Sequence, residues 1–395
     1  MEGVLTVALA MAALPPMQVL NGIDVLERDG FRLLQGRSVG LITNHTGRTL
    51  DGRQTADVLF RAPGVRLVAL FGPEHGIRGE LDEAIEDGRD PATGLPVYSL
   101  YNPREREYRY RPRPEQLEGI DTLVFDIQDV GSRFYTYIGT LGYAMEEAAK
   151  RGIRVIVLDR PNPIRGLYVG GPLSEPKHRG LTAHHELPVA HGMTVGELAR
   201  LFNEERKIGC DLQVVPMQGW SRKMWFDETG QTWVNPSPNM RSPTQALLYP
   251  GICLIEATNV SVGRGTDTPF EWIGAPWIDG RELAAAMNSK RLAGIRFYPR
   301  SNVPSSSKYA GEVCGGVSMV VVDRSRLDPV RVGMELAHEL ARRYPQWDRS
   351  KLVNLVANDE AARLIVEKGA RATERRFAEE LAEFRKVRER HLLYR

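Results

Sequence analysis

The sequence predicts a two-domain α/β protein whose first domain contains a parallel sheet. Four short runs are almost continuously apolar, as expected of parallel strands that are buried on both faces. A helical pattern at 137–152 lies between the last two runs and completes a βαβ unit. A stretch rich in Pro, Asn and Ser at 227–250 then indicates a domain boundary near residue 240. The four runs are Ser38–Thr43, Val65–Leu70, Thr122–Phe125 and Arg154–Leu158.

Length and composition agree with this organisation. The chain has 395 residues, enough for two or three domains that each bury a core. Hydrophobic residues make up 42% and charged residues 26%, which is typical of a globular protein. We therefore expect an N-terminal extension at 1–21, a first domain with the parallel sheet at 22–240 and a second domain at 241–395.

Charge and hydropathy exclude some classes of partner. The 52 basic and 50 acidic residues give a net charge of +2, so no electrostatic case exists for nucleic acid or an anionic membrane. No apolar run reaches the roughly 18 residues of a membrane span. The Ala-rich Val4–Leu14 has the length of an export signal, but no Lys or Arg precedes it. Export and a cytoplasmic location stay equally open, as does the oligomeric state.

Neither a metal nor a cofactor is expected. The three cysteines, Cys210, Cys253 and Cys314, are far apart and form no CxxC pair, so we expect small buried side chains. The histidines at 178–191 fit no HExxH-type spacing. The segment 263–266 is rich in glycine but lacks the GxxxxGK[ST] pattern of a phosphate-binding loop.

Local signals predict further elements. Three pairs of residues fit a capping box at a helix start, so we assign Glu197 and Glu282 to structure rather than chemistry. A short strand is expected at Met319–Val322, and a long terminal helix should turn one apolar stripe toward the core. The pairs are Asp51 with Gln54, Thr194 with Glu197 and Asp279 with Glu282; the stripe is Phe377, Leu381, Phe384 and Val387.

Polar residues follow all four predicted strands. Ligands of open parallel sheets bind outside the carboxyl ends of the strands, so these residues are expected to share one edge. Four such clusters at one edge favour a functional site over a purely structural explanation. They are Asn44 after the first strand, Glu74 and His75 after the second, Asp126, Gln128 and Asp129 after the third, and Asp159 and Arg160 after the fourth.

Glu74 is the leading candidate for catalysis. It lies between Gly72-Pro73 and Gly76, a pattern suited to a sharp turn that projects a side chain. A carboxyl group in a partly dry pocket is the general acid that glycoside hydrolysis needs. His75 is a candidate proton partner or substrate donor.

The segment after the third strand supplies the next candidates. On an extended chain Asp126 and Gln128 share a face and Asp129 does not, which leaves Asp129 a positioning or N-cap role. We therefore place Asp126 and Gln128 in the site. Arg133 could bind a carboxylate through two parallel hydrogen bonds.

A second polar cluster opens the C-terminal half. Glu256, Asn259 and Arg264 follow the apolar stretch 252–255 and suit contacts to hydroxyl, amide and carboxylate groups. A competing signature, S-x-x-K at Ser305–Lys308, is that of a serine acylase. It lacks the SDN and KTG partners, and the chain has no GxSxG. An acylase or esterase is therefore the weaker alternative.

Long motifs resemble the exo-β-N-acetylmuramidases of bacterial peptidoglycan turnover, over residues 22–330. The resemblance implies a Rossmann-like domain and a smaller α/β domain with the active site in the cleft between them. It also implies release of terminal N-acetylmuramic acid from the non-reducing end of glycan fragments. The family's probable catalytic glutamate falls on Glu74, and the second catalytic group stays open. The motifs are FGPEHGIRGE (71–80), TGLPVYSLY (93–101), FDIQDVGSRFYTYI (125–138), VLDRPNP (157–163), PVAHGMTVGELA (188–199), WVNPSPNM (233–240), YPGICLIEATNVSVGRGTDTPFEWIGAPW (249–277) and YAGEVCGGV (309–317).

Muramic acid differs from glucosamine by a lactyl carboxylate, so a selective enzyme needs a cation at that point. Arg133 and Arg264 are the candidates, and bidentate pairing would contribute roughly 1.5–3 kcal/mol. A non-catalytic muropeptide-binding protein is the alternative from another class. The expected catalytic residues are Glu74, His75 and Asp126, and the expected substrate-binding residues are Asn44, Gln128, Arg133, Tyr135, Asp159, Arg160, His191, Asn239, Glu256, Asn259 and Arg264.

Overall fold

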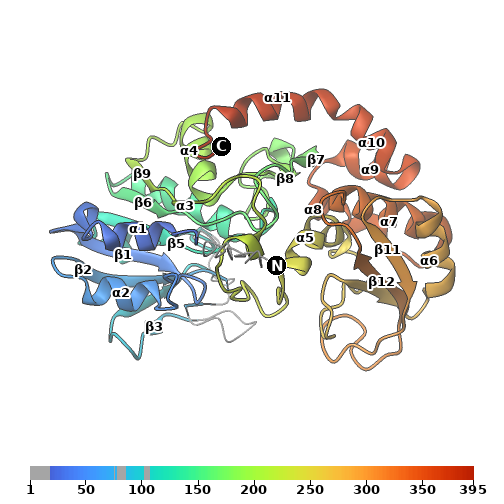
Figure 1. Cartoon of the computed structure of the whole chain (residues 1–395), viewed down its shortest axis with the longest axis horizontal. Coiled ribbons are helices and arrows are strands. Elements are labelled where there is room, and N and C mark those ends of the chain that lie inside the picture. The colour runs from blue at the N-terminus through green and yellow to red at the C-terminus, as the bar shows by residue number, and fades with distance from the viewer. Residues whose placement is uncertain (1–17, 75, 78–85, 102–106) are drawn as a thin grey trace, which may run out of the picture.

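The computed structural model describes residues 18–74, 76, 77, 86–101 and 107–395. It confirms an α/β protein with a parallel central sheet and a second, smaller α/β part beside it (Figure 1). The Ala-rich start of the chain and His75 lie outside the described residues. The boundary near residue 240 stays a prediction.

The larger part is built on a sheet with the strand order β3-β4-β2-β1-β5-β6-β9. All neighbouring strands run parallel except β3 and β4. Two predicted strands are confirmed to the residue, and the other two end one or two residues later than expected. The strands are β1 (Ser38–Thr43), β2 (Arg66–Gly72), β3 (Gly88–Arg89), β4 (Pro96–Ser99), β5 (Thr122–Asp126), β6 (Arg154–Leu158) and β9 (Leu212–Val215).

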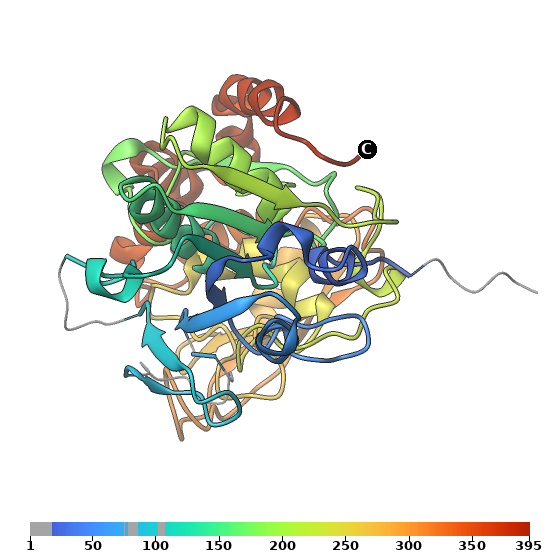
Figure 2. The ribbon, with the colours of Figure 1, turned by 90° about the vertical axis from the view of Figure 1, so that its left-hand side faces the viewer.

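Helices cover both faces of this sheet, which explains why its strands are apolar throughout (Figure 2). Successive side chains of a strand point to opposite faces. Leu123 and Phe125 accordingly join the main hydrophobic core, while Val124 between them joins a second core. The helices of this part are α1 (Gly22–Arg28), α2 (Thr55–Arg61), α3 (Tyr137–Ala149) and α4 (Val195–Glu205), and a small hairpin is formed by β7 (Gly170–Leu173) and β8 (Pro188–Ala190).

The predicted helix starts have different outcomes. The capping box of Thr194 and Glu197 is confirmed at the start of α4. Asp279 accepts hydrogen bonds from the first turn of α6, as an N-cap should. The third prediction is wrong, because Gln54 is the N-cap of α2. Asp51 instead accepts hydrogen bonds from Thr49 and Arg53 and closes the turn before that helix.

The smaller part contains an antiparallel sheet with the order β10-β12-β11, flanked by helices. The strand expected at Met319–Val322 is the end of β12. Its strands are β10 (Trp272–Ala275), β11 (Ile295–Pro299) and β12 (Gly315–Val321), and its helices are α5 (Pro243–Ile252), α6 (Gly280–Ser289), α7 (Pro329–Arg343), α8 (Val353–Val356), α9 (Asp359–Lys368), α10 (Ala370–Arg376) and α11 (Ala378–Glu389). Short 3₁₀ turns connect several elements: Arg32–Leu34, Pro114–Leu117, Pro176–His178, Phe226–Glu228, Cys253–Ile255 and Arg349–Lys351.

The terminal segment is divided into α10 and α11 rather than one long helix. Phe377 lies at the junction and enters the main core. Phe384, with Leu381 and Val387, packs instead against the α4 side chains that include Phe202. The stripe therefore faces apolar residues as expected, but in two separate clusters.

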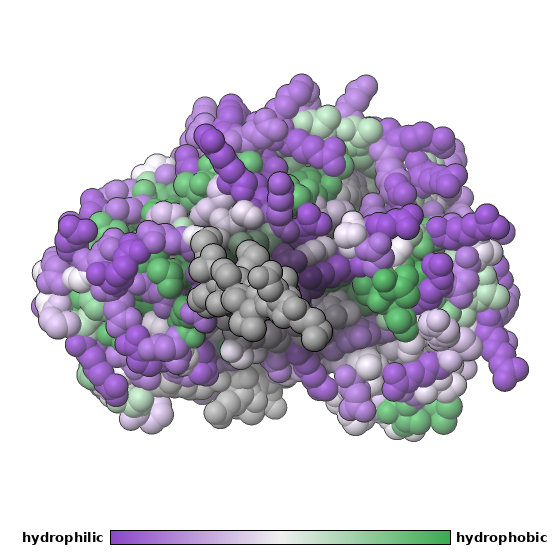
Figure 3. Space-filling view, in the orientation of Figure 1, coloured by the Kyte–Doolittle hydropathy of each residue, from purple (hydrophilic) through white to green (hydrophobic). Residues whose placement is uncertain are grey.

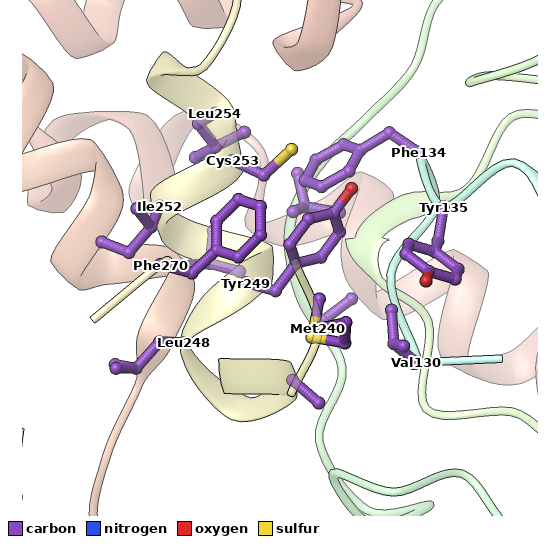
Figure 4. Packing of buried hydrophobic residues seen from close by; sticks show 14 of the residues in the cluster. Val130, Phe134, Tyr135, Met240, Leu248, Tyr249, Ile252, Cys253, Leu254 and Phe270 are labelled. Atoms are coloured by element: carbon purple, nitrogen blue, oxygen red, sulfur yellow. The ribbon is translucent and has the colours of Figure 1, made fainter. Parts of the chain in front are cut away.

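The two parts share one hydrophobic core. Figure 4 shows Phe134 and Tyr135 of the larger part facing Tyr249 and Phe270 of the smaller one, and the ring centroids of Phe134 and Tyr249 are 5.5 Å apart. Helix α11 crosses back over the larger part, where the C-terminus ends near α4 (Figure 1). The expectation of three small buried cysteines is confirmed: all three are free and buried. In the described part of the chain, no helix is long and apolar enough to cross a membrane.

Candidate active site

The carboxyl ends of β2, β1, β5 and β6 lie along one edge of the sheet. The parallel register pairs Thr43 with Asp126 and Ile42 with Phe125, so the residues that follow each strand emerge together. Between the two parts the molecular surface is hollowed, and hydrophilic residues border the hollow (Figure 3). The geometry of each predicted residue decides whether it can serve this site.

Glu74 sits on a tight turn directly after β2. The amide of Gly76 donates to the Pro73 carbonyl, and Gly76 has a φ of 68°, which glycine adopts without strain. The Thr136 hydroxyl donates to Glu74 Oε2 at 2.8 Å. The carboxylate is only partly buried, so it is held in place yet open to a ligand.

Tyr101 is a second neighbour of Glu74. Burial, followed by the negative charge of Glu74, raises the pKa of Tyr101 to about 12. The phenol therefore stays neutral at physiological pH and can only donate or accept hydrogen bonds. Sequence reasoning missed both Tyr101 and Thr136, although each lies in a motif that it had singled out.

Tyr135 lies where the two parts meet. It is 7% exposed, and its hydroxyl has no hydrogen-bond partner of acceptable geometry in the described structure. Burial raises its pKa; Asp129 and Glu74 raise it further, while Arg264 lowers it. Charged groups from both parts thus surround this one hydroxyl.

Asp129 and His191 form a buried pair behind Tyr135. The Asp129 Oδ2 atom accepts from the Gly131 amide at 2.7 Å and lies 3.6 Å from His191 Nε2. His191 Nδ1 accepts from the Met193 amide, so the proton of the neutral ring belongs on Nε2. Asp129 Oδ1 is buried without a partner in the described structure.

Arg264 approaches the same region from the smaller part. Its Nε atom donates to Glu256, and this carboxylate raises the pKa of the guanidinium. Cys253 donates to the other oxygen of Glu256 at 3.0 Å. Glu256 occupies the Nε edge of Arg264, and about a third of the side chain is exposed. Among the described residues, no side chain forms an ion pair with the two terminal nitrogens, so they can bind a carboxylate.

Asp126 and Arg160 are brought together but are closed to a ligand. Arg160 binds both oxygens of Asp126, at 2.5 and 2.9 Å, and the Thr55 hydroxyl adds a further bond. Asp126 is 0% exposed. The protein itself fills the oxygens of Asp126, so this arrangement argues against the predicted catalytic role of Asp126.

Asp159 also serves the fold rather than a ligand. It accepts hydrogen bonds from the Gly196 amide, the Thr194 hydroxyl and, at 2.6 Å, the hydroxyl of Tyr394. It thereby joins β6, the start of α4 and the C-terminal tail. Burial raises the pKa of Asp159 to about 6.

Arg133 and Asn259 are corrected as well. Arg133 is 1% exposed, and its guanidinium donates to the Leu355 and Val356 carbonyls at the end of α8, each at 2.9 Å. Burial lowers its pKa to about 9. Asn259 uses its side-chain amide to bind the Gln346 carbonyl and the Asp348 amide. Neither residue can read a substrate in this arrangement.

The remaining candidates line the edge in different ways. Asn44 Oδ1 accepts from Thr46, while its Nδ2 is buried without a hydrogen-bond partner in the described structure. Gln128 donates to the Asp129 and Pro161 carbonyls, so its amide is fixed. Asn239 is 8% exposed.

The groups that remain open to a ligand suit proton transfer and the binding of a polar, anionic molecule. A partly exposed carboxylate on a rigid turn can transfer a proton, and buried hydroxyl, imidazole and amide groups can bind a polar ligand. A guanidinium with a free edge can bind an anion. A sugar that carries a carboxylate fits this set of groups.

Comparison with known proteins agrees. Family models described as the N-terminal and C-terminal domains of exo-beta-N-acetylmuramidase NamZ match residues 39–244 and 247–394. The peptidoglycan beta-N-acetylmuramidase NamZ of Bacillus subtilis (strain 168) is 42% identical over 384 residues, covering 95% of this chain and 92% of that protein.

Solved structures show the same fold. A DUF1343 family protein of Bacteroides fragilis NCTC 9343 superposes with a TM-score of 0.89 and 36% identity, covering 96% of this chain and all of the other. A second DUF1343 family protein of the same organism has a TM-score of 0.76 and 28% identity, with 96% and 99% coverage.

Proposed function

Since this chain belongs to the exo-β-N-acetylmuramidase NamZ family, we propose that it hydrolyses peptidoglycan fragments with Glu74 as its general acid. The product is terminal N-acetylmuramic acid, released from the non-reducing end. The observation that carries the assignment is the state of the carboxylates at the strand ends. Glu74 is partly exposed on a fixed turn, whereas Asp126 and Asp159 are sealed by internal hydrogen bonds.

Glu74 would protonate the glycosidic oxygen as the bond to the anomeric carbon breaks. Thr136 and the neutral hydroxyl of Tyr101 restrict the orientation of the carboxyl group. Positive charge then develops on the sugar ring, and a negative Glu74 stabilises it after the proton has left. His75, which adjoins this turn in the sequence, stays a candidate partner outside the described residues.

Asp129 is proposed to act through Tyr135. Its free oxygen is buried next to that tyrosine, so a direct contact with substrate is not available in this arrangement. Tyr135 stays protonated because burial raises its pKa, and its hydroxyl can donate to a sugar substituent. Asp129 would act on this hydroxyl through its charge, and His191 lies beside Asp129, which makes both positioning residues.

Arg264 is proposed to bind the lactyl carboxylate. Its terminal nitrogens are the free donors, and Glu256 holds the other edge of the guanidinium. The pair leaves the open edge pointing away from Glu256, the arrangement that a bidentate contact needs. Arg133 no longer competes for this role, because backbone carbonyls occupy its guanidinium.

A direct experiment compares chromogenic glycosides of N-acetylmuramic acid and N-acetylglucosamine. Hydrolysis of the first and a much slower reaction of the second are expected. Nuclear magnetic resonance detection of the first-formed anomer then identifies a retaining or an inverting reaction. Prolonged EDTA treatment should leave the rate unchanged. Tight binding of the muramic acid glycoside without any hydrolysis would favour the non-catalytic binding protein instead.

A further inference from the structure

A cavity of about 160 Å³ lies at the same sheet edge, on the side of α1 and α2. None of the groups assigned to acid catalysis or to the lactyl carboxylate lines it. Its walls come from the start of α1, the loops after β1 and β5, and the segment before α5. The lining residues are Asn21, Thr46, Arg48, Thr49, Leu50, Asp51, Gly52, Gln128, Arg160, Phe226, Gln231, Thr232 and Val234.

The position of the cavity is informative. Strands β1 and β5 are adjacent in the sheet but distant in sequence, and the strand order runs outward from them in both directions. This is the topological switch point, where the loops of two neighbouring strands diverge and leave a crevice for a ligand. Thr46 follows β1 and Gln128 follows β5, and both line the cavity.

The walls are polar and preorganised. Thr46, Thr49 and Gln128 are each at most 5% exposed. The Thr46 hydroxyl accepts a hydrogen bond from the backbone N–H of Gln128 at 3.0 Å, and this bond connects the two strand-end loops. Asn21 and Gln231 exchange two side-chain hydrogen bonds, at 2.8 and 3.2 Å. Such fixed amides and hydroxyls are typical of a site that orients a small polar ligand.

Arg48 gives the cavity its charge. Its guanidinium donates to the backbone carbonyls of His45 and Gly52, and no carboxylate pairs with it in the described part of the chain. The other arginine of the cavity, Arg160, is neutralised by Asp126. The carboxylate of Asp51 is engaged by Arg53. Arg48 is therefore an uncompensated cation held in place by backbone.

A short backbone segment, 234–237, runs from this cavity to Tyr135. His45 Nε2 binds the Asn235 carbonyl at 2.6 Å, and the Tyr137 hydroxyl donates to the Pro236 carbonyl at 2.5 Å. These bonds fix the segment over the strand ends. Val234 faces the cavity, while Ser237, three residues on, acts on the pKa of Tyr135.

We propose that this cavity is a second ligand site, which binds a small hydroxy carboxylate. Arg48 supplies the cation for the carboxylate. The donors of the surrounding amides and hydroxyls bind other groups of the protein, so the hydroxyl of the ligand would donate to a side-chain oxygen such as Gln128 Oε1. The cavity is about as large as an engineered cavity of roughly 150 Å³ that holds benzene, so the part of a ligand that lies inside it is a small group such as a hydroxy carboxylate.

The test uses glycerate as the probe and glycerol as its neutral counterpart, with binding measured by saturation-transfer nuclear magnetic resonance. Glycerate is expected to bind and glycerol to bind at least tenfold more weakly. Arg48→Gln should weaken glycerate binding at least tenfold. Val234→Phe, which fills the cavity and keeps Arg48, should do the same. Arg61→Gln is the matched control, because Arg61 is an exposed arginine at the end of α2 that does not line the cavity, and this variant should bind glycerate normally.

The same variants test whether the site is separate. Turnover of a muramic acid glycoside should be unchanged in Arg48→Gln and Val234→Phe. Absence of glycerate binding to the wild type, or equal binding by Arg48→Gln, would overturn the proposal. A selective loss of muramic acid turnover in Arg48→Gln would also overturn it, since the cavity would then belong to the substrate cleft. None of these outcomes depends on the role of Glu74.

Discussion

Two groups of charged residues follow the same parallel strands, and they differ in what remains free. In the first group, Arg160 binds both oxygens of Asp126, and the hydroxyls of Thr194 and Tyr394 bind Asp159. The protein itself therefore occupies the hydrogen-bonding atoms of this closed group. Glu74 and Arg264 are held at one edge and keep another edge open. Residues at strand ends thus differ in their remaining hydrogen-bonding capacity, and this capacity is the basis on which we propose Glu74 and Arg264 for function.

The largest expected effect is on stability, in the closed group. Arg160→Met leaves Asp126 as a buried carboxylate without its cation, which costs about 3–5 kcal/mol. Urea unfolding monitored by fluorescence measures this loss. The residual folded enzyme should keep a turnover number near that of the wild type. A stable variant with strongly reduced turnover would instead show that Arg160 takes part in the reaction or in substrate binding.

The next largest effect is expected on catalysis, at Glu74, which keeps one edge of its side chain open. Glu74→Gln removes the transferable proton and should lower turnover of a muramic acid disaccharide at least about a hundredfold. The side chain is partly exposed, so the midpoint of urea unfolding should hardly change. Steady-state kinetics and unfolding on the same preparation separate the two effects.

Arg264 and Arg133 offer a matched pair of arginines. Arg264→Ala should lower the ratio of kcat/KM for muramic acid over glucosamine glycosides by about tenfold to a hundredfold, from the loss of a bidentate contact. Arg133→Ala should leave that ratio intact and lower the melting temperature, because it releases the carbonyls that end α8. An unchanged ratio in both variants would mean that another cation reads the lactyl group.

The smallest effect is a pH dependence of stability at Asp159. Burial raises its pKa from 3.8 to about 6, so the folded state holds this proton more tightly than the unfolded state. The stabilisation is complete below about pH 4 and is lost as the pH rises through 6. Asp159→Asn removes this contribution, and its stability deficit relative to wild type should shrink from pH 4 to pH 7 in urea titrations. A deficit that grows over this range would contradict the assignment.

Sequence patterns predicted the elements of the sheet because its strands are apolar on both faces. They also predicted the tight turn that carries Glu74, because a Gly-Pro-Glu turn is a local feature. They failed where the partner is remote in sequence. Arg133 donates a hydrogen bond to the carbonyl of Leu355, which is 222 residues away in the sequence. Asp159 accepts one from the hydroxyl of Tyr394, which is 235 residues away. No local pattern predicts such contacts. Before the fold is known, an arginine or aspartate whose hydrogen-bonding atoms are all engaged therefore cannot be distinguished from one with free atoms.

The central claim is that Glu74 donates a proton to the leaving group. It is tested most directly by comparing Glu74→Gln on two muramic acid glycosides, one with an acidic dinitrophenol and one with N-acetylglucosamine as the leaving group. The dinitrophenolate needs no proton to depart, so the variant should retain most of its activity on that substrate and lose at least about a hundredfold on the disaccharide. Equal losses on both substrates would contradict an acid role for Glu74.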